Sequence, residues 1–167
     1  MSRGEPPIDV VRLERTLHAP PDAVFRAFLD PALLRQWIAP DELSIDRVIV
    51  DPRVGGRVEV WHSMNGVSSG RFEGCFLKID PPRELVYRWA FVGTEPEKGE
   101  FFDTLVTVRL RPAPWGQTHI SVVHEKLEEL YRGARNVYVR LLPGWTNCLE
   151  KLERAAQGIA PDARSAH

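Results

Sequence analysis

The sequence predicts an α+β fold in which a curved antiparallel sheet of about seven strands wraps around a long C-terminal helix. Three observations support this prediction. Residues 43–126 alternate between apolar and polar side chains with the period of two that is typical of half-buried strands. Turn-forming residues separate these runs, which favours antiparallel neighbours. Beyond residue 136 the apolar residues recur every three or four positions, as on one face of an amphipathic helix.

The first strand is predicted over residues 10–17, and two short helices follow it. The segment 19–22 (APPD) ends the strand and begins the first helix, because proline is tolerated in the first turn of a helix. A second helix is predicted from Asp30-Pro31, with Asp30 as its N-cap, and it ends at Ala39-Pro40.

The period-two region predicts six further strands, and a long helix follows them. Asn65-Gly66 is typical of a two-residue hairpin turn, and residues 93–100 are predicted as a charged loop. Pro143-Gly144 lies within the final helical pattern and predicts a kink or a helix start. The predicted strands span 43–50, 57–62, 69–79, 84–91, 102–111 and 117–125, and the helical face comprises Val137, Leu141, Trp145, Cys148, Leu152 and Ala155.

The chain of 167 residues suits one domain of ordinary size. We expect a flexible N-terminal arm over 1–8, a single domain over 9–157 and a flexible C-terminal tail over 158–167. No linker, repeat or low-complexity stretch divides residues 9–157.

Composition and charge exclude several classes of protein. The formal charge of −1 and the absence of a long basic run are untypical of nucleic-acid binders. No stretch approaches the ~18 apolar residues of a membrane-spanning helix, and the N-terminus shows no apolar core of a signal peptide. Cys75 and Cys148 are the only cysteines, too few for a disulfide framework or a cysteine zinc site. We therefore expect a cytoplasmic protein with no metal and no cofactor.

Fifteen aromatic residues, five of them tryptophan, are generous for one small domain. The strand alternation places many of them on the sheet face that meets the long helix, where a ligand cavity can form. The same alternation fits a filled core, so both interpretations stay open. The candidate ligand-binding residues are Trp37, Val60, His62, Phe72, Phe76, Tyr87, Trp89, Val106, His124, Leu141 and Trp145.

His62 and His124 are the polar members of this set, since each ends the inward-facing series of its strand. One interpretation is a polar contact or a general base at the end of an apolar cavity. The other is a histidine that is satisfied structurally. Neither has partners at the spacing of a metal site, and the sequence supports no catalytic residue.

Several segments, in their order and spacing, resemble the SRPBCC superfamily, also called START-like or helix-grip. Within it, the chain is most similar to the group named after the C-terminal domain of the activator of the 90-kDa heat-shock chaperone ATPase. The resemblance covers about residues 10–156. It rests on His18-Ala19-Pro20, Val24 to Phe28, Asp30-Pro31, Trp37, Val54-Gly55-Gly56, Gly74 to Ile79, Pro81 to Trp89, Thr118 to Glu125 and Gly144-Trp145.

The resemblance implies a helix-grip fold and leaves three functions open. The first is binding of a small hydrophobic molecule, aromatic or lipid-like, in a cavity between the sheet and the C-terminal helix. The second is an enzyme of the polyketide cyclase or aromatase type, which would use His62, His124 or Tyr87. The third is an interaction protein, either a chaperone partner linked to stress response or a homodimer, with Trp61 and Trp115 as candidate exposed surface.

Overall fold

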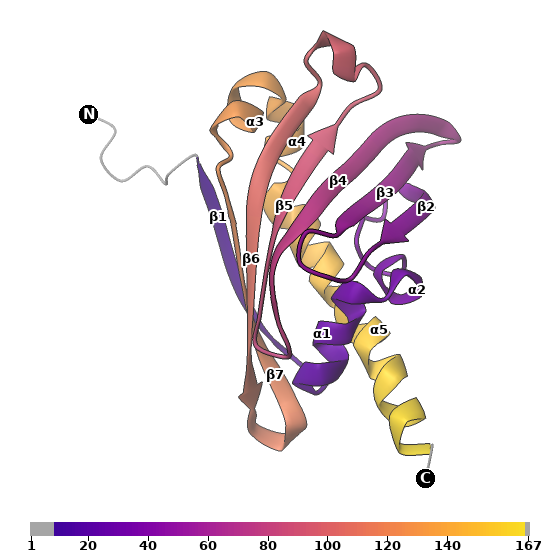
Figure 1. Cartoon of the computed structure of the whole chain (residues 1–167), viewed down its shortest axis with the longest axis vertical. Helices are drawn as coiled ribbons and strands as arrows, with labels where there is room; N and C mark the ends of the chain where they lie inside the picture. The colour runs from indigo at the N-terminus through magenta and orange to yellow at the C-terminus, as the bar shows by residue number, and fades with distance from the viewer. Residues whose placement is uncertain (1–8, 166–167) are drawn as a thin grey trace, which may run out of the picture.

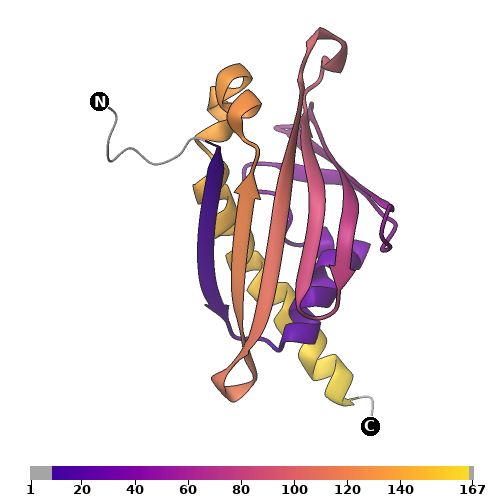
Figure 2. The ribbon, with the colours of Figure 1, turned by 60° about the vertical axis from the view of Figure 1, so that its left-hand side comes forward.

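A seven-stranded antiparallel sheet curves around the long helix α5, as Figures 1 and 2 show from two directions. This computed structural model describes residues 9–165, with side chains to residue 158. The strand order is β1-β7-β6-β5-β4-β3-β2, so the first and last strands are neighbours. Helix α5 crosses the inner face of the sheet diagonally, and helix α1 packs against it. The predicted α+β helix-grip fold is confirmed.

The strands form where the alternation of the sequence predicts them. Two of them, β1 and β7, have the predicted bounds, and the other strands begin or end a few residues from theirs. Asn65 and Gly66 have φ angles of 54° and 79°, which are the left-handed values that a two-residue hairpin turn requires. The strands are β1 Val10–Leu17, β2 Ser44–Val50, β3 Arg57–Met64, β4 Val67–Asp80, β5 Glu84–Val92, β6 Phe101–Ala113 and β7 Gln117–Glu125.

The two short helices begin at the proline-containing segments that the sequence marks. Helix α1 spans Pro21–Leu29 and α2 spans Pro31–Leu34. The Asp30 carboxylate accepts a hydrogen bond from the backbone N–H of Ala32 at 2.9 Å, which confirms Asp30 as the N-cap. Two single 3₁₀ turns lie elsewhere, η1 at Pro96–Lys98 in the β5–β6 loop and η2 at Pro114–Gly116 in the β6–β7 turn.

The C-terminal region differs from the single long helix that the apolar pattern indicates. Helices α3 (Glu128–Gly133) and α4 (Arg135–Tyr138) precede α5 (Leu141–Ser165), and Val137 belongs to α4. Both are too short for their apolar residues to show a helical period. Because Pro143 falls in the first turn of α5, Pro143-Gly144 marks a helix start.

The ends of the chain define what can be said of the predicted arm and tail. The arm predicted over 1–8 lies outside the described residues, as do residues 166–167. Of the tail predicted over 158–167, the backbone continues α5 as far as Ser165.

The main core lies between the inner face of the sheet, helix α1 and the apolar side of α5. Gly74 on β4 faces Trp89 on β5, and a Cβ at position 74 would lie 2.4 Å from the Arg88 carbonyl oxygen and 3.3 Å from the Trp89 ring. The glycine therefore lets the two strands pair while the Trp89 ring packs over position 74.

The described residues contain neither a membrane-spanning helix nor a group of side chains suited to a metal ion. None of the helices in residues 9–165 is long and apolar enough to cross a membrane. Within the same residues, no three His, Cys, Asp or Glu side chains are grouped so that they could hold a metal ion.

Candidate functional site

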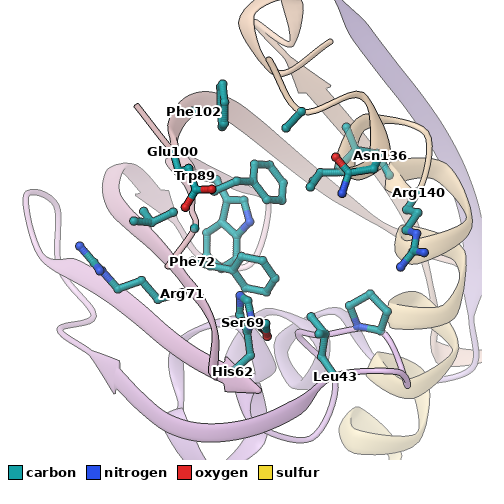
Figure 3. Close-up of a pocket in the computed structure, with 18 of the residues that line it drawn as sticks. Leu43, His62, Ser69, Arg71, Phe72, Trp89, Glu100, Phe102, Asn136 and Arg140 are labelled. Atoms are coloured by element: carbon teal, nitrogen blue, oxygen red, sulfur yellow. Dashed lines mark hydrogen bonds between the residues drawn. The ribbon is translucent and has the colours of Figure 1, made fainter. Parts of the chain in front are cut away.

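A cavity of about 820 Å³ lies between the sheet, the N-terminal half of α5 and the loop between α2 and β2 (Figure 3). Its back wall is the inner face of β3, β4 and β5. The front wall comprises Leu43 and neighbouring loop residues together with Leu141, Trp145 and Cys148 of α5. The opening lies where α4, the β3–β4 hairpin and the β5–β6 loop meet, because exposed residues such as Met64, Lys98 and Asn136 line the cavity there.

Aromatic rings form a continuous wall on the strand side of the cavity. The Phe72 ring lies at the centre of this wall, with its centroid 5.2 Å from that of Trp89 and 5.7 Å from that of Phe91. Tyr87 extends the series beside Trp89 at 5.6 Å. The wall arises because these residues occupy alternate positions on β4 and β5, so that all of them project from one face of the sheet. Planar rings at these separations offer flat apolar surface to a ligand.

His124 is buried in a closed chain of hydrogen bonds. The Trp145 Nε1–H donates to His124 Nδ1 at 3.0 Å, so the ring proton lies on Nε2. This N–H donates to Thr104 Oγ1 at 2.7 Å, and the Thr104 hydroxyl donates to the Trp89 carbonyl oxygen at 2.5 Å. Burial lowers the pKa of His124 to about 3. The ring is therefore neutral and both its nitrogens are hydrogen-bonded. This geometry agrees with the second interpretation of the sequence, in which the histidine is satisfied structurally.

His62 lies at the edge of the cavity, on β3. Its Nδ1 is 2.6 Å from the Ser69 hydroxyl, and its ring is 4.6 Å from that of Phe72. Burial lowers the pKa of His62 to about 4, although the nearby Asp46 carboxylate acts in the opposite direction. His62 is therefore also neutral near pH 7, and Nδ1 is the nitrogen that pairs with Ser69.

Three further polar groups of the cavity wall have no hydrogen-bond partner among the described residues: the Tyr87 hydroxyl, the Trp89 indole N–H and the Cys148 thiol. All three side chains are less than 10% exposed. Burial raises the pKa of the Tyr87 hydroxyl and, secondarily, so does the nearby Cys148. Burial also raises the pKa of the Cys148 thiol to about 12. Both groups are therefore protonated and uncharged at neutral pH.

The charged residues of the cavity are confined to its rim, where all of them are at least partly exposed. Arg71 pairs with Glu73 at 2.9 Å and stacks on the Trp61 ring, and Lys98 pairs with Glu95. The charged lining residues are Glu42, Arg71, Lys98, Glu100 and Arg140.

Seven of the eleven residues that the sequence nominates line this cavity: His62, Phe72, Tyr87, Trp89, His124, Leu141 and Trp145. The other four, Trp37, Val60, Phe76 and Val106, are at most 2% exposed and pack in the core outside it. The Trp37 indole donates to the Ala27 carbonyl oxygen at 2.9 Å and packs edge-on against Phe28. A pattern with period two identifies the inner face but not the depth along each strand, so it cannot separate cavity residues from core residues.

Sequence reasoning did not nominate several residues that shape the site. Ser69 orients His62, and Thr104 completes the bonds around His124. The position of Thr104 on the inward face of β6 was a usable signal, since a buried hydroxyl requires a partner. The front wall had no such signal. Asp41 and Asn147 exchange two hydrogen bonds across 106 residues of sequence, and they hold the α2–β2 loop against α5.

Comparison with known proteins places these features in a family context. Residues 18–157 match the family model described as Activator of Hsp90 ATPase homolog 1-like protein. No curated protein matches the chain.

Solved structures of similar proteins share the fold over nearly their full length. Protein CV1439 from Chromobacterium violaceum is 29% identical, with 87% of this chain and 96% of that chain covered and a TM-score of 0.69. The AHSA1 protein from Silicibacter pomeroyi is 23% identical, with 92% and 99% covered and a TM-score of 0.70. Protein NE0264 from Nitrosomonas europaea is 21% identical, with 92% and 97% covered and a TM-score of 0.72.

Proposed function

The chain belongs to the Activator of Hsp90 ATPase homolog 1-like family, and from this and the geometry of its cavity we propose that it binds a small hydrophobic molecule, aromatic or lipid-like, between the sheet and α5. The observation that carries the proposal is the cavity of about 820 Å³ with its wall of aromatic rings. Pockets for small ligands are concave, mostly apolar and about 300–1,000 Å³ in volume.

The polar groups of the cavity support binding better than acid–base catalysis. A histidine that acts as a general base needs a ring nitrogen that is free to accept a proton and a pKa near the working pH. Both ring nitrogens of His124 are already hydrogen-bonded, and the pKa of His62 is lowered to about 4. The Tyr87 hydroxyl has a raised pKa, which makes it a poor base at neutral pH. We therefore favour binding over the cyclase or aromatase reaction.

The test is thermal unfolding with and without 2-isopropylnaphthalene, an uncharged aromatic hydrocarbon. A ligand at 100 times its Kd stabilises the folded state by about 2.7 kcal/mol, which raises the Tm of a domain of this size by about 5–10 °C. Native mass spectrometry of the purified protein should show a bound molecule of the same mass as the added hydrocarbon. Unchanged Tm at the solubility limit, with no adduct in the mass spectrum, would reject the proposal.

A blocking variant tests whether the hydrocarbon binds in this cavity. Gly144 lines the cavity from α5, and a Cβ there would lie 3.5 Å from Pro40, an ordinary contact. The larger side chain of Gly144→Leu should occupy ligand space and abolish the rise in Tm. Gly158→Leu is the matched control, because Gly158 lies on the same helix with nothing within 4 Å of an added Cβ. If both variants keep the full rise in Tm, the hydrocarbon binds elsewhere.

A further inference from the structure

We propose that the ligand enters this cavity as an uncharged molecule whose buried end carries a hydrogen-bond acceptor, such as a ketone carbonyl, and that the Tyr87 hydroxyl and the Trp89 indole N–H donate to it. This inference rests on the proposed function, and it specifies the chemical class of the ligand.

The first observation is the pair of donors without partners. Tyr87 and Trp89 are 4% and 7% exposed, and neither the Tyr87 hydroxyl nor the Trp89 N–H has a hydrogen-bond partner among the described residues. Every fully buried side-chain nitrogen and oxygen in those residues does have one. The two donor atoms must therefore reach open space. Both side chains line the cavity of about 820 Å³, and the other void that they border is only about 10 Å³, too small for a ligand.

The two donors lie on the same strand, two positions apart, so both project from the inner face of β5. Their ring centroids are 5.6 Å apart. In Figure 3 the Trp89 ring lies above Phe72 in the cavity wall and away from the charged rim residue Arg140. An acceptor atom between such donors gains hydrogen bonds that a hydrocarbon ligand leaves unmade, and an unmade buried hydrogen bond is costly.

The second observation is the absence of a buried charge among the lining residues that the structure describes. The ionised side chains of the lining are the exposed or half-exposed ones at the rim. The remaining titratable groups, His62, His124, Tyr87 and Cys148, are all in their uncharged forms at neutral pH. A carboxylate inserted beside Trp89 would lose its hydration without gaining a cation, which is strongly unfavourable. A ketone, ester or neutral amide loses far less hydration free energy when it enters the same place.

Three ligands of nearly the same shape test the hydrogen bond to an acceptor separately from the requirement for an uncharged ligand. They are 2-acetylnaphthalene, 2-isopropylnaphthalene and 2-naphthoate. They differ in one substituent, which is a carbonyl, a hydrocarbon group or a carboxylate. Each Kd is measured by titration calorimetry against the wild type, Tyr87→Phe and Tyr131→Phe. Tyr131 is the matched control, because its ring stacks on Arg135 outside the cavity lining.

We expect Tyr87→Phe to weaken binding of 2-acetylnaphthalene about fivefold, the effect of one lost hydrogen bond. The same variant should not weaken binding of 2-isopropylnaphthalene and should tighten it, because it removes a hydroxyl that this hydrocarbon leaves unpaired. Tyr131→Phe should change neither Kd. The wild type should bind 2-acetylnaphthalene at least about tenfold more tightly than 2-naphthoate. The carbonyl stretch of bound 2-acetylnaphthalene, labelled with ¹³C, should lie at a lower wavenumber than in hexane, and this measurement needs no variant.

The outcomes distinguish this inference from the proposed function. If the wild type binds none of the three ligands, the proposed function fails and this inference fails with it. If 2-isopropylnaphthalene binds but Tyr87→Phe leaves the Kd of 2-acetylnaphthalene unchanged and its carbonyl stretch matches that in hexane, the donor site is wrong while the proposed function stands. Tighter binding of 2-naphthoate than of 2-acetylnaphthalene would overturn the requirement for an uncharged ligand.

Discussion

The buried ring of His124 makes the stability of this protein depend on pH in a way that one substitution can isolate. The pKa of His124 is about 3 in the folded protein and 6.5 in an unperturbed chain. Between these values the unfolded state binds more protons than the folded state, so the free energy of unfolding falls as the pH falls. The loss begins near pH 6.5 and continues to about pH 3.

The size of the effect follows from the distance in pH below 6.5, the ordinary pKa of the ring. At pH 5, which is one and a half pH units below 6.5, protonation of this ring stabilises the unfolded state by about 1.36 kcal/mol per unit. The free energy of unfolding is therefore lower by about 2 kcal/mol. Other groups add their own dependence, and His62, whose folded pKa is also lowered, acts with the same sign. The contribution of His124 is therefore measured as a difference between two proteins.

The substitution is His124→Gln, because a glutamine amide can accept from Trp145 and donate to Thr104 but does not titrate. Urea unfolding at pH 7 and pH 5, followed by circular dichroism, gives the free energy of unfolding of each protein. The wild type should lose about 2 kcal/mol more than His124→Gln between these pH values. His18→Gln, which changes an exposed side chain, should behave as the wild type does. Equal losses in wild type and His124→Gln would refute the neutral, doubly hydrogen-bonded ring.

Three further substitutions test individual parts of the structure, and urea unfolding measures each of them. Trp37→Phe removes the hydrogen bond to the Ala27 carbonyl and part of a fully buried ring, so it should lower the free energy of unfolding by about 2–3 kcal/mol. Because Trp37 lies outside the cavity lining, the Kd of 2-isopropylnaphthalene should stay within twofold of the wild-type value. Gly74→Ala places a Cβ 2.4 Å from the Arg88 carbonyl oxygen and should cost about 2 kcal/mol or more, whereas an unchanged midpoint would mean that β4 and β5 separate freely. Asp30→Ala removes the N-cap of α2 and should cost about 1 kcal/mol, and restoring the cap with Asp30→Asn should recover most of it.

Local patterns were sufficient to predict most of the sheet. Alternation of side chains along β5 and β7 is a property of a few consecutive residues, and Asn65-Gly66 adopts the positive φ angles of its turn almost independently of what surrounds it. Helices α3 and α4 were not predicted, because one turn or two of helix carries too few apolar residues to define a period.

The candidate site was predicted in part. The sequence identified the face of the sheet that carries Phe72, Tyr87 and Trp89, and all three line the cavity. It did not distinguish these from Phe76 and Val106, which share the same face but lie in the filled part of the core. Where the core ends and the cavity begins depends on how far α5 and α1 stand from each point of the sheet. That distance is set by packing between segments far apart in the chain.

The sequence by itself determined the α+β class, the inner face of the sheet and the accumulation of aromatic residues on it, because these follow from side-chain periodicity within single elements. Tertiary structure alone decided the states of the polar groups. Trp145, 21 residues away along the chain, fixes the ring proton of His124 on Nε2, and the Thr104 hydroxyl, 20 residues away, accepts the hydrogen bond from that N–H. The Tyr87 hydroxyl and the Trp89 N–H have no such partner among the residues that the structure describes. Hydrogen bonds and burial depend on which distant segments meet, and only the folded chain brings those segments together.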